Sequence, residues 1–420
     1  MQFYIRVFCT ITFFAAITAT EARNADYYFD LALKNNARLA ADRNLAAAAQ
    51  GDYRKESVFN ENPELMLGLM NVPVNTFPAL NKDQMSSFSV GVSQRIALPW
   101  ESNYRKTAAE FRAATTGFAF EQQKATVRYE TAERLSALIY VSERKKILID
   151  AKKLLTATLR ILANPRKDQR NTAGQILEAR AALATIDNDI LANDFELEKL
   201  WVELESLCGE KLERETSFEG MESWKAAAFP AIDFNAETLQ ASIIYRKAES
   251  EVRSQQAMLS LSRAALFPEV KLQMNYMFRQ QVPGSSMGDN MVTVAASTPM
   301  PLFYPLKNRH EIDAQSERLK ATESLLIETG RQLTAQVKTE RARLTALLAS
   351  IENYSRAILP SHISAHRSHL ATVNVMGGSA AEALLSYRMY LTASEERLKQ
   401  IREAHSAVNR LQYLLAKGDK

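Results

Sequence analysis

Three of the five histidines in this 420-residue chain have a spacing that suits metal binding. His362, His366 and His369 stand at positions i, i+4 and i+7, which places them on one face of a helix. Neutral imidazoles four residues apart can chelate zinc, nickel or copper. The segment has no neighbouring cysteine or carboxylate, and a polar helix face would show the same pattern. We favour the polar face and keep the metal site as the alternative.

Methionines gather in and near four candidate strands, where they could offer thioether ligands to copper. They are Met66, Met70, Met274, Met277, Met287 and Met291. Packing against lipid or along a channel wall also explains them, and this is the interpretation that we favour. The sequence therefore predicts no metal centre and no cofactor.

No enzyme signature is present in the chain. It contains no His-Glu-x-x-His, no phosphate-cradling glycine loop and no Gly-x-Ser-x-Gly elbow. Gly377-Gly378-Ser379 precedes a helical segment and could bind an anion, but a tight turn needs the same small residues. The formal net charge of +4 is small and the charges are interspersed, so nucleic acid is not an expected partner. We predict a protein that is not an enzyme.

The first 22 residues have the pattern of a signal peptide. A short segment with Arg6 is followed by an apolar run from Val7 to Ile17, and small residues lead to a predicted cleavage site after Ala22, with Ala19 as the alternative. Cys9 would leave with this peptide, so Cys208 is the only cysteine expected in the mature chain. A small apolar residue at a helix end is the favoured interpretation of Cys208, and a reactive thiol is the alternative.

The remaining sequence is internally duplicated. Pro63-Glu64 and Pro268-Glu269 both follow a helical pattern and open a strand pattern, at a spacing of 268 − 63 = 205 residues. The segments at Val90 and Val294 repeat this at 294 − 90 = 204, and those around Arg180 and Arg388 at 388 − 180 = 208. A doubled unit of long helices and two short strands is typical of a tube rather than of a catalytic globule.

Proline and glycine positions set the predicted boundaries of the two repeats. The first repeat covers 23–209, with a helix from Tyr27 to Val58, strands 63–73 and 86–97, and long helices 101–163 and 175–207. A linker covers 210–232. The second repeat covers 233–420, with a helix from Ala236 to Leu266, strands 268–280 and 290–300, and long helices 306–373 and 379–416. Helix 101–163 alone would be about 95 Å long.

The strand at 268–280 alternates clearly between polar and apolar residues. Glu269, Lys271, Gln273 and Asn275 point one way, and Val270, Leu272, Met274 and Tyr276 the other. Such strands suit a membrane β-barrel with apolar side chains toward lipid and polar ones toward a lumen. Four strands cannot close a barrel, and an open edge in lipid is costly, so the chain must oligomerise. Three copies would supply twelve strands. A small soluble sheet with one wet face is the alternative.

These features resemble those of the TolC-like outer-membrane factors. The resemblance covers about Tyr27 to Ala416 and rests on the strand entries at Pro63 and Pro268 and on the strand exits 93–99 and 297–302. It also includes the turn 374–380 before a Leu-rich helix. The stretch before the first long helix looks most like the heavy-metal efflux branch, although Trp100-Glu101 replaces the glycine and basic residue usual there. At the first tip, Gln169 stands where a glycine is expected.

The resemblance implies a fold that is mainly α with membrane β: a trimeric twelve-strand outer-membrane barrel continued by a periplasmic α-helical barrel. It implies a homotrimer in outer-membrane lipid, a periplasmic adaptor, and an inner-membrane pump such as a resistance-nodulation-division transporter. The adaptor would dock at the helix tips. The tip residues are Val375, Met376, Gly377, Gly378, Ser379, Asn171 and Gly174.

The function expected from the resemblance is a passive outer-membrane exit duct of a tripartite efflux system, for small molecules or metal ions. Two alternatives stay open at this point. One is a type I secretion duct for proteins, and the other is an exported coiled-coil scaffold, against which the strand alternation at 269–276 speaks.

Overall fold

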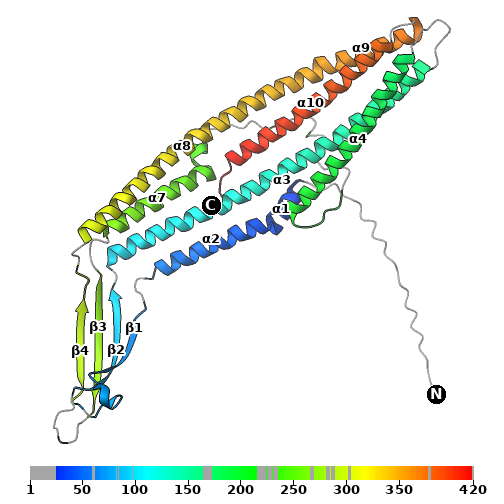
Figure 1. Ribbon diagram of the computed structural model, residues 1–420. Helices are drawn as coiled ribbons and strands as arrows, with labels where there is room; N and C mark the ends of the chain where they lie inside the picture. Colours follow the sequence, from blue (N-terminus) through cyan, green and yellow to red (C-terminus); the bar gives the residue numbers. More distant parts are fainter. Residues whose placement is uncertain are drawn as a thin grey trace, which may run out of the picture.

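The computed structural model describes residues 25–58, 62–81, 83, 85–96, 98–163, 173–214, 224, 229, 235–264, 269–280, 284, 289–300, 304–376 and 380–418. The predicted signal peptide lies outside these ranges. The described chain is elongated, with a four-stranded sheet at one end and long helices running away from it to a distant tip (Figure 1). No described helix is long and apolar enough to cross a membrane.

Two rounds of the same element order make up the chain. The first consists of α1 (Ala25–Asn35), α2 (Ala37–Glu56), β1 (Glu64–Met70), a short 3-10 helix (Val74–Thr76), β2 (Ser87–Ile96), α3 (Pro99–Ala163) and α4 (Ala173–Cys208). The second consists of α6 (Ala236–Gln240), α7 (Ile243–Ala264), β3 (Val270–Arg279), β4 (Met291–Ser297), α8 (Tyr304–Asn353), the π turn η2 (Tyr354–Ile358), α9 (Leu359–Met376) and α10 (Ala380–Leu414). Each predicted strand overlaps one observed strand, and each observed strand is shorter.

The first helix of each round is broken, where the sequence patterns predicted one continuous helix. Asn36 has an extended backbone (ψ 116°), and its side-chain oxygen accepts from the Leu39 amide at 3.1 Å, so it caps α2. In the second round, Ser242 precedes α7 and its hydroxyl oxygen accepts from the Tyr245 amide at 3.3 Å. Both breaks therefore fall at short polar side chains that replace the lost helical acceptors.

The break between α1 and α2 packs against the end of α4. The Asn36 side chain donates to the Leu207 carbonyl at 3.4 Å. Gly209 ends α4 with φ +69°, and a Cβ there would lie 3.0 Å from the Asn35 carbonyl oxygen. Only glycine suits this left-handed position beside another backbone.

A second correction concerns the predicted helix 306–373, which contains a π turn and extends to Met376. Pro360 has no amide hydrogen, so the bond to the carbonyl four residues earlier cannot form. The wider turn at 354–358 accommodates this loss.

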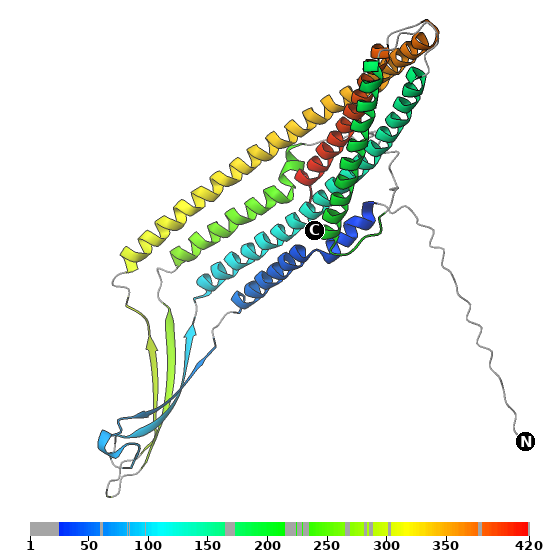
Figure 2. The same ribbon diagram turned by 45° about the vertical axis from the view of Figure 1, so that its right-hand side comes forward.

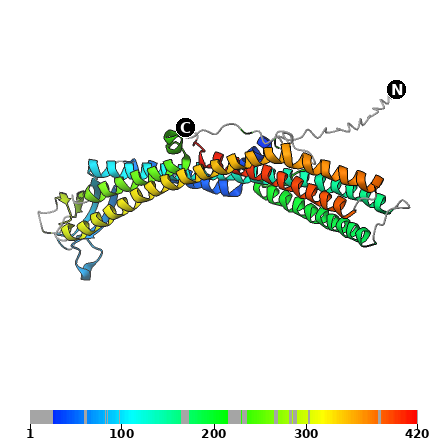
Figure 3. The same ribbon diagram turned by 90° about the horizontal axis from the view of Figure 1, so that it is seen from above.

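The helices form a curved wall. Near the sheet, the order of neighbouring helices across the wall is α2, α3, α7, α8. Near the tip, the order is α4, α3, α10, α9 (Figure 2). The 65-residue α3 extends through both the sheet-side part and the tip-side part of the wall and packs against helices in each. Seen from above, the helices follow a shallow arc (Figure 3). The two edges of this wall are α2 with α4 on one side and α8 with α9 on the other.

Two apolar clusters hold the wall. The larger lies at mid-length and contains the fully buried Leu138, Leu204 and Ile401. Trp224 joins it from the linker: its ring stacks on His405 with centroids 5.0 Å apart, and its Nε1 donates to the Ser136 hydroxyl at 3.1 Å. The smaller cluster lies toward the tip, around Leu155 and other side chains of α3, α4 and α10.

Candidate functional site: the sheet, its junction with the helices, and the tip

The sheet has the strand order β1-β2-β3-β4, entirely antiparallel, and its register gathers mostly apolar side chains on one face, with Gln94 as an exception. One row across the sheet reads Leu65, Val92, Met274, Val294, and the next reads Leu67, Val90, Tyr276, Val292. Most of these side chains are exposed, up to 74% for Val294. The alternation predicted for 270–276 is therefore continuous over all four strands.

The opposite face carries polar, charged and small residues together with four methionines. Its rows include Glu64, Ser93 and Gln273, then Met66, Gly91, Asn275 and Thr293. A Cβ at Gly91 would lie 1.7 Å from the Asn275 side-chain oxygen, so a larger residue at this position would displace that side chain. The Asn275 amide thus lies flat over the backbone of β2. This face is suited to water, whereas the other is suited to lipid.

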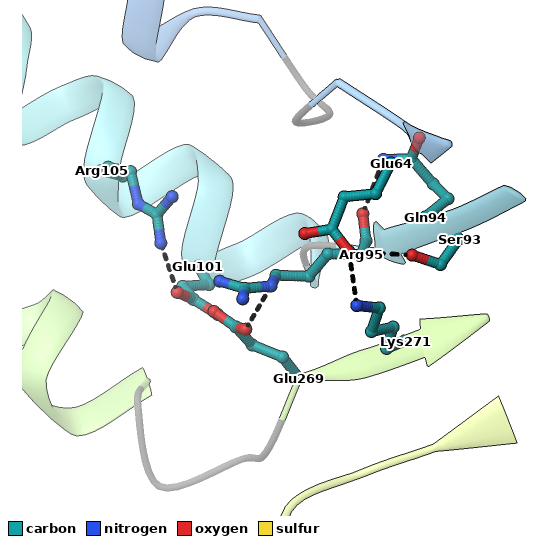
Figure 4. A network of polar contacts seen from close by, with 8 residues as sticks. All are labelled: Glu64, Ser93, Gln94, Arg95, Glu101, Arg105, Glu269 and Lys271. Carbon is teal, nitrogen blue, oxygen red and sulfur yellow. Dashed lines mark hydrogen bonds and ion pairs between the residues drawn. The ribbon is translucent and has the colours of Figure 1, made fainter. Parts of the chain in front are cut away.

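Charged side chains meet on the polar face where strands give way to helices (Figure 4). Lys271 of β3 donates to Glu64 of β1 at 2.6 Å, and Ser93 donates to the same carboxylate at 3.0 Å. Arg95 of β2 pairs with Glu269 at 3.2 Å. Each repeat thus supplies a glutamate directly after its strand-opening proline, and each glutamate binds a cation of the other repeat.

The first turn of α3 extends this junction network. Glu101 is buried at 7% exposure and accepts from Arg105 at 2.7 Å. The Arg105 guanidinium also lies 3.9 Å from the Glu56 carboxylate at the end of α2. The network was not predicted from the sequence. The sequence offered one signal for it, the Pro-Glu pair that is repeated at a spacing of 269 − 64 = 205 residues. The cationic partners of the two glutamates could not be identified, because they depend on how the strands pair.

The tip is described only in part. Val375 and Met376 lie in the last turn of α9, and Gly174 lies exposed in the first turn of α4. Gly377, Gly378, Ser379 and Asn171 lie outside the described residues. The helix ends that flank these residues belong to both repeats and lie together at the end of the wall farthest from the sheet (Figure 1).

The three histidines have different surroundings. His366 is buried between α9 and α10, and its Nδ1 lies 3.2 Å from the Ala383 carbonyl. His369 instead faces Glu382 of α10 at 3.5 Å, and His362 is half-buried. Across the described chain, no group of three or more His, Cys, Asp or Glu side chains is arranged to hold a metal ion. Two of the three histidines thus contact α10, the neighbouring helix.

Burial shifts the pKa of His366 and that of Cys208. Burial lowers the pKa of His366 from its ordinary 6.5, against a smaller opposing effect of the bond to Ala383. Its Nε2 and the neighbouring Tyr387 hydroxyl have no hydrogen-bond partner among the described residues. Burial also raises the pKa of the Cys208 thiol to about 11, and Glu210 adds to this. Cys208 is therefore an unreactive core thiol.

His366 should make the tip bundle sensitive to acid. Because its folded pKa lies below the unfolded value, its contribution to stability is complete above about pH 6.5 and decreases as the pH falls through the window below. We expect the melting temperature to drop between about pH 7.5 and about pH 5, and His366→Asn, which keeps a donor for Ala383 without a titrating ring, to show a smaller drop. Thermal melts of the detergent-solubilised protein across this range test the expectation. His369→Asn is the control, and an unchanged slope in His366→Asn would contradict the assignment.

Comparisons with known proteins agree on the architecture. No protein-family model and no curated protein matches the sequence. Solved structures do match. The outer-membrane channel OprN superposes with a TM-score of 0.77 at 15% identity, over 94% of this chain and 90% of that one. CusC, whose structures concern folding and transmembrane channel formation, superposes with a TM-score of 0.79 at 16% identity, over 94% of this chain and 92% of that one.

The open state of the MtrE outer membrane channel of Neisseria gonorrhoeae gives a TM-score of 0.77 at 16% identity, over 94% of this chain and 89% of that one. These neighbours are channels, not enzymes. The resemblance drawn from the sequence is confirmed at the level of the fold: the chain has the fold of the TolC-like outer-membrane channels.

Proposed function

We propose that this protein is the outer-membrane exit duct of a tripartite efflux system. After removal of the signal peptide, three copies close a twelve-strand barrel in the outer membrane and continue it as a helical barrel across the periplasm. A periplasmic adaptor and an inner-membrane pump, such as a resistance-nodulation-division transporter, supply the cargo and the energy. The duct itself performs no chemistry. The observation that carries the proposal is a two-faced sheet with exposed apolar side chains and two open edges.

The open edges support closure by copies of the same chain. β1 and β4 each pair with one strand only, so each has a row of backbone groups without a strand partner among the described strands. In hydrocarbon every such group costs several kcal/mol, roughly, and only a closed barrel removes the cost. Joining β1 of one copy to β4 of the next pairs both rows, and three copies give an even strand number.

The helices at the two edges of the wall, α4 on one side and α8 with α9 on the other, also have complementary surfaces. Large apolar side chains project from α4 at heptad-like spacing and are 52–71% exposed: Leu177, Leu191, Phe195 and Val202. On the opposite edge, the exposed residues of α8 and α9 include a series of small ones among charged side chains: Ala342, Ala346, Ala349, Ser361, Ser364, Ser368 and Ala371. Large side chains of one helix fit between small ones of another, as in coiled coils. We infer that α4 of one copy packs on α8 and α9 of the next.

Phe195→Asp should disrupt this seam. Burial of a phenylalanine contributes about 1.5–3 kcal/mol, and a trimer repeats the contact at three seams. We expect Phe195→Asp to yield monomers or dimers in detergent, and Phe195→Leu to stay trimeric. Light scattering on size-exclusion peaks measures the mass. A Phe195→Asp protein that is fully trimeric would move the seam away from α4.

The two sheet faces should respond differently to charge. Met274 and Gln273 are neighbours in the middle of the sheet but lie on opposite faces. Met274→Arg should destabilise the inserted barrel by about 2–4 kcal/mol near the membrane midplane, whereas Gln273→Arg faces the lumen. The amount of trimer in the outer-membrane fraction is the readout. Equal losses in both variants, or wild-type protein found in the soluble periplasm, would refute the membrane barrel.

The adaptor is proposed to dock at the tip, at Val375 to Ser379 in the second repeat and at Asn171 and Gly174 in the first. Gly377→Asp should leave export, trimers and insertion intact but abolish efflux, because a charged side chain disturbs a tight turn at the contact surface. Crosslinking to the adaptor, read beside a resistance assay, tests this. Full resistance in a well-expressed variant would place docking elsewhere, and missing trimers would assign the glycine to assembly.

A further inference from the structure

Methionines are placed unevenly on the two faces of the sheet. Five lie in the described strands, and the register puts four of them on the polar face: Met66, Met70, Met277 and Met291. Only Met274 lies on the apolar face, among Val92, Val294 and other aliphatic side chains. On the polar face, apart from the small Ala295, the methionines are the only apolar side chains within the four strands.

Hydrophobic packing does not account for this placement. An apolar residue gains by burial, and here that gain is available on the lipid-suited face, where leucine, valine and phenylalanine stand. Met70 and Met291 are instead 42% and 46% exposed on the face suited to water. What distinguishes methionine from those residues is its polarisable thioether sulfur.

Two of these thioethers are placed to converge on one ion. Met277 of β3 and Met291 of β4 are direct cross-strand partners. The Cβ atoms of such partners lie roughly 4.5–5.5 Å apart, and each methionine has three side-chain torsions with which to turn its sulfur inward. Two sulfurs therefore reach a shared ion without a backbone change.

A closed barrel would add further sulfurs. Met291 lies on the edge strand β4, and Met66 and Met70 lie on the other edge strand, β1, on the same polar face. Joining β1 of the next copy to β4 brings that copy's methionines to the seam beside Met291. The thioether group is then repeated three times around the lumen.

The electrostatic surroundings favour a soft monovalent ion over a hard divalent one. Arg279 follows Met277 by two residues on the same face. If the pairing of β3 with β4 is continued two residues beyond Met277 and Met291, Asp289 lies opposite Arg279. At the other end of the sheet, Lys271 and Arg95 are each paired with a glutamate. No carboxylate stands within the Met277–Met291 pair itself. Neutral thioethers select soft cations such as Cu(I) and Ag(I), whereas magnesium and calcium need oxygen ligands.

We propose that Met277 and Met291 form a thioether site for a soft monovalent metal cation on the lumen wall, with Met66 and Met70 of the adjacent copy at its rim. The inference rests on the proposed duct, because it requires the polar face to line a lumen. The proposal places thioether metal ligands on the lumen wall, which the passage of water or organic molecules would not require.

Silver(I) is the probe, because it is soft and stable in one oxidation state. Binding is measured by equilibrium dialysis on the full-length trimer in detergent, in a Cys208→Ala background so that no thiol competes. Wild-type methionines should bind Ag⁺, and Met277→Leu with Met291→Leu should weaken the binding by about tenfold or more. Met274→Leu is the matched control, since it removes a thioether from the same strand but from the apolar face, and it should leave the affinity unchanged.

Three outcomes overturn the site: equal Ag⁺ binding by the double variant and wild type, an equal loss in Met274→Leu, or Zn²⁺ bound as tightly as Ag⁺. Single Met277→Leu and Met291→Leu variants give the same answer if the double variant is unstable. The trimeric state is checked first. A wild-type protein that is not trimeric would count against the proposed duct. A wild-type trimer that does not bind Ag⁺ selectively would refute only the thioether site.

Discussion

The need to pair every backbone group of the sheet is the constraint on which the rest of this structure depends. The four described antiparallel strands leave two open edges, and in the proposed membrane barrel no water would be present in the hydrocarbon to pair with them. A soluble protein could cover such edges with a loop or charge them. Here the helices continue away from the sheet instead of folding over it (Figure 1). The elongated shape and the complementary edge helices are both consistent with closure by further copies.

The junction between sheet and helices shows how duplication is used. Glu64 and Glu269 occupy equivalent places in the two repeats, and each binds a cation from the other repeat. Partly exposed ion pairs such as these contribute only about 0–1 kcal/mol each, so their weight in overall stability is small. Their value is geometric. Reciprocal pairs hold β1, β2 and β3 in one register at the point where the chain changes from strand to helix.

The wall of helices depends on a different balance. Its core at mid-length is deep enough for fully buried leucines and isoleucine, whereas the sheet end has almost no buried apolar side chains. The tip lies between these cases. There the buried imidazole of His366 lies beside Ala383 and Tyr387 of the smaller cluster, and burial favours its neutral form. Protonation of His366 therefore weakens the tip bundle, and His405, whose pKa burial also lowers, has the same effect in the mid-length core.

The duplication, the helical character of most of the chain and the two-faced strands could be predicted from the sequence, because a repeat spacing and a period of two are local properties. The helix breaks at Asn36 and Ser242 could have been found from their capping side chains, but long helical periodicity obscured them. The pairing of Lys271 with Glu64, which lie 207 residues apart, and the burial of His366 against α10 were decided only by the tertiary structure. A histidine stripe looks the same whether it faces a metal or a neighbouring helix, because the pattern records the face and not what covers it. In the same way, the sequence showed that methionines gather in the strands, and only the strand register decided which of them share a face and are neighbours.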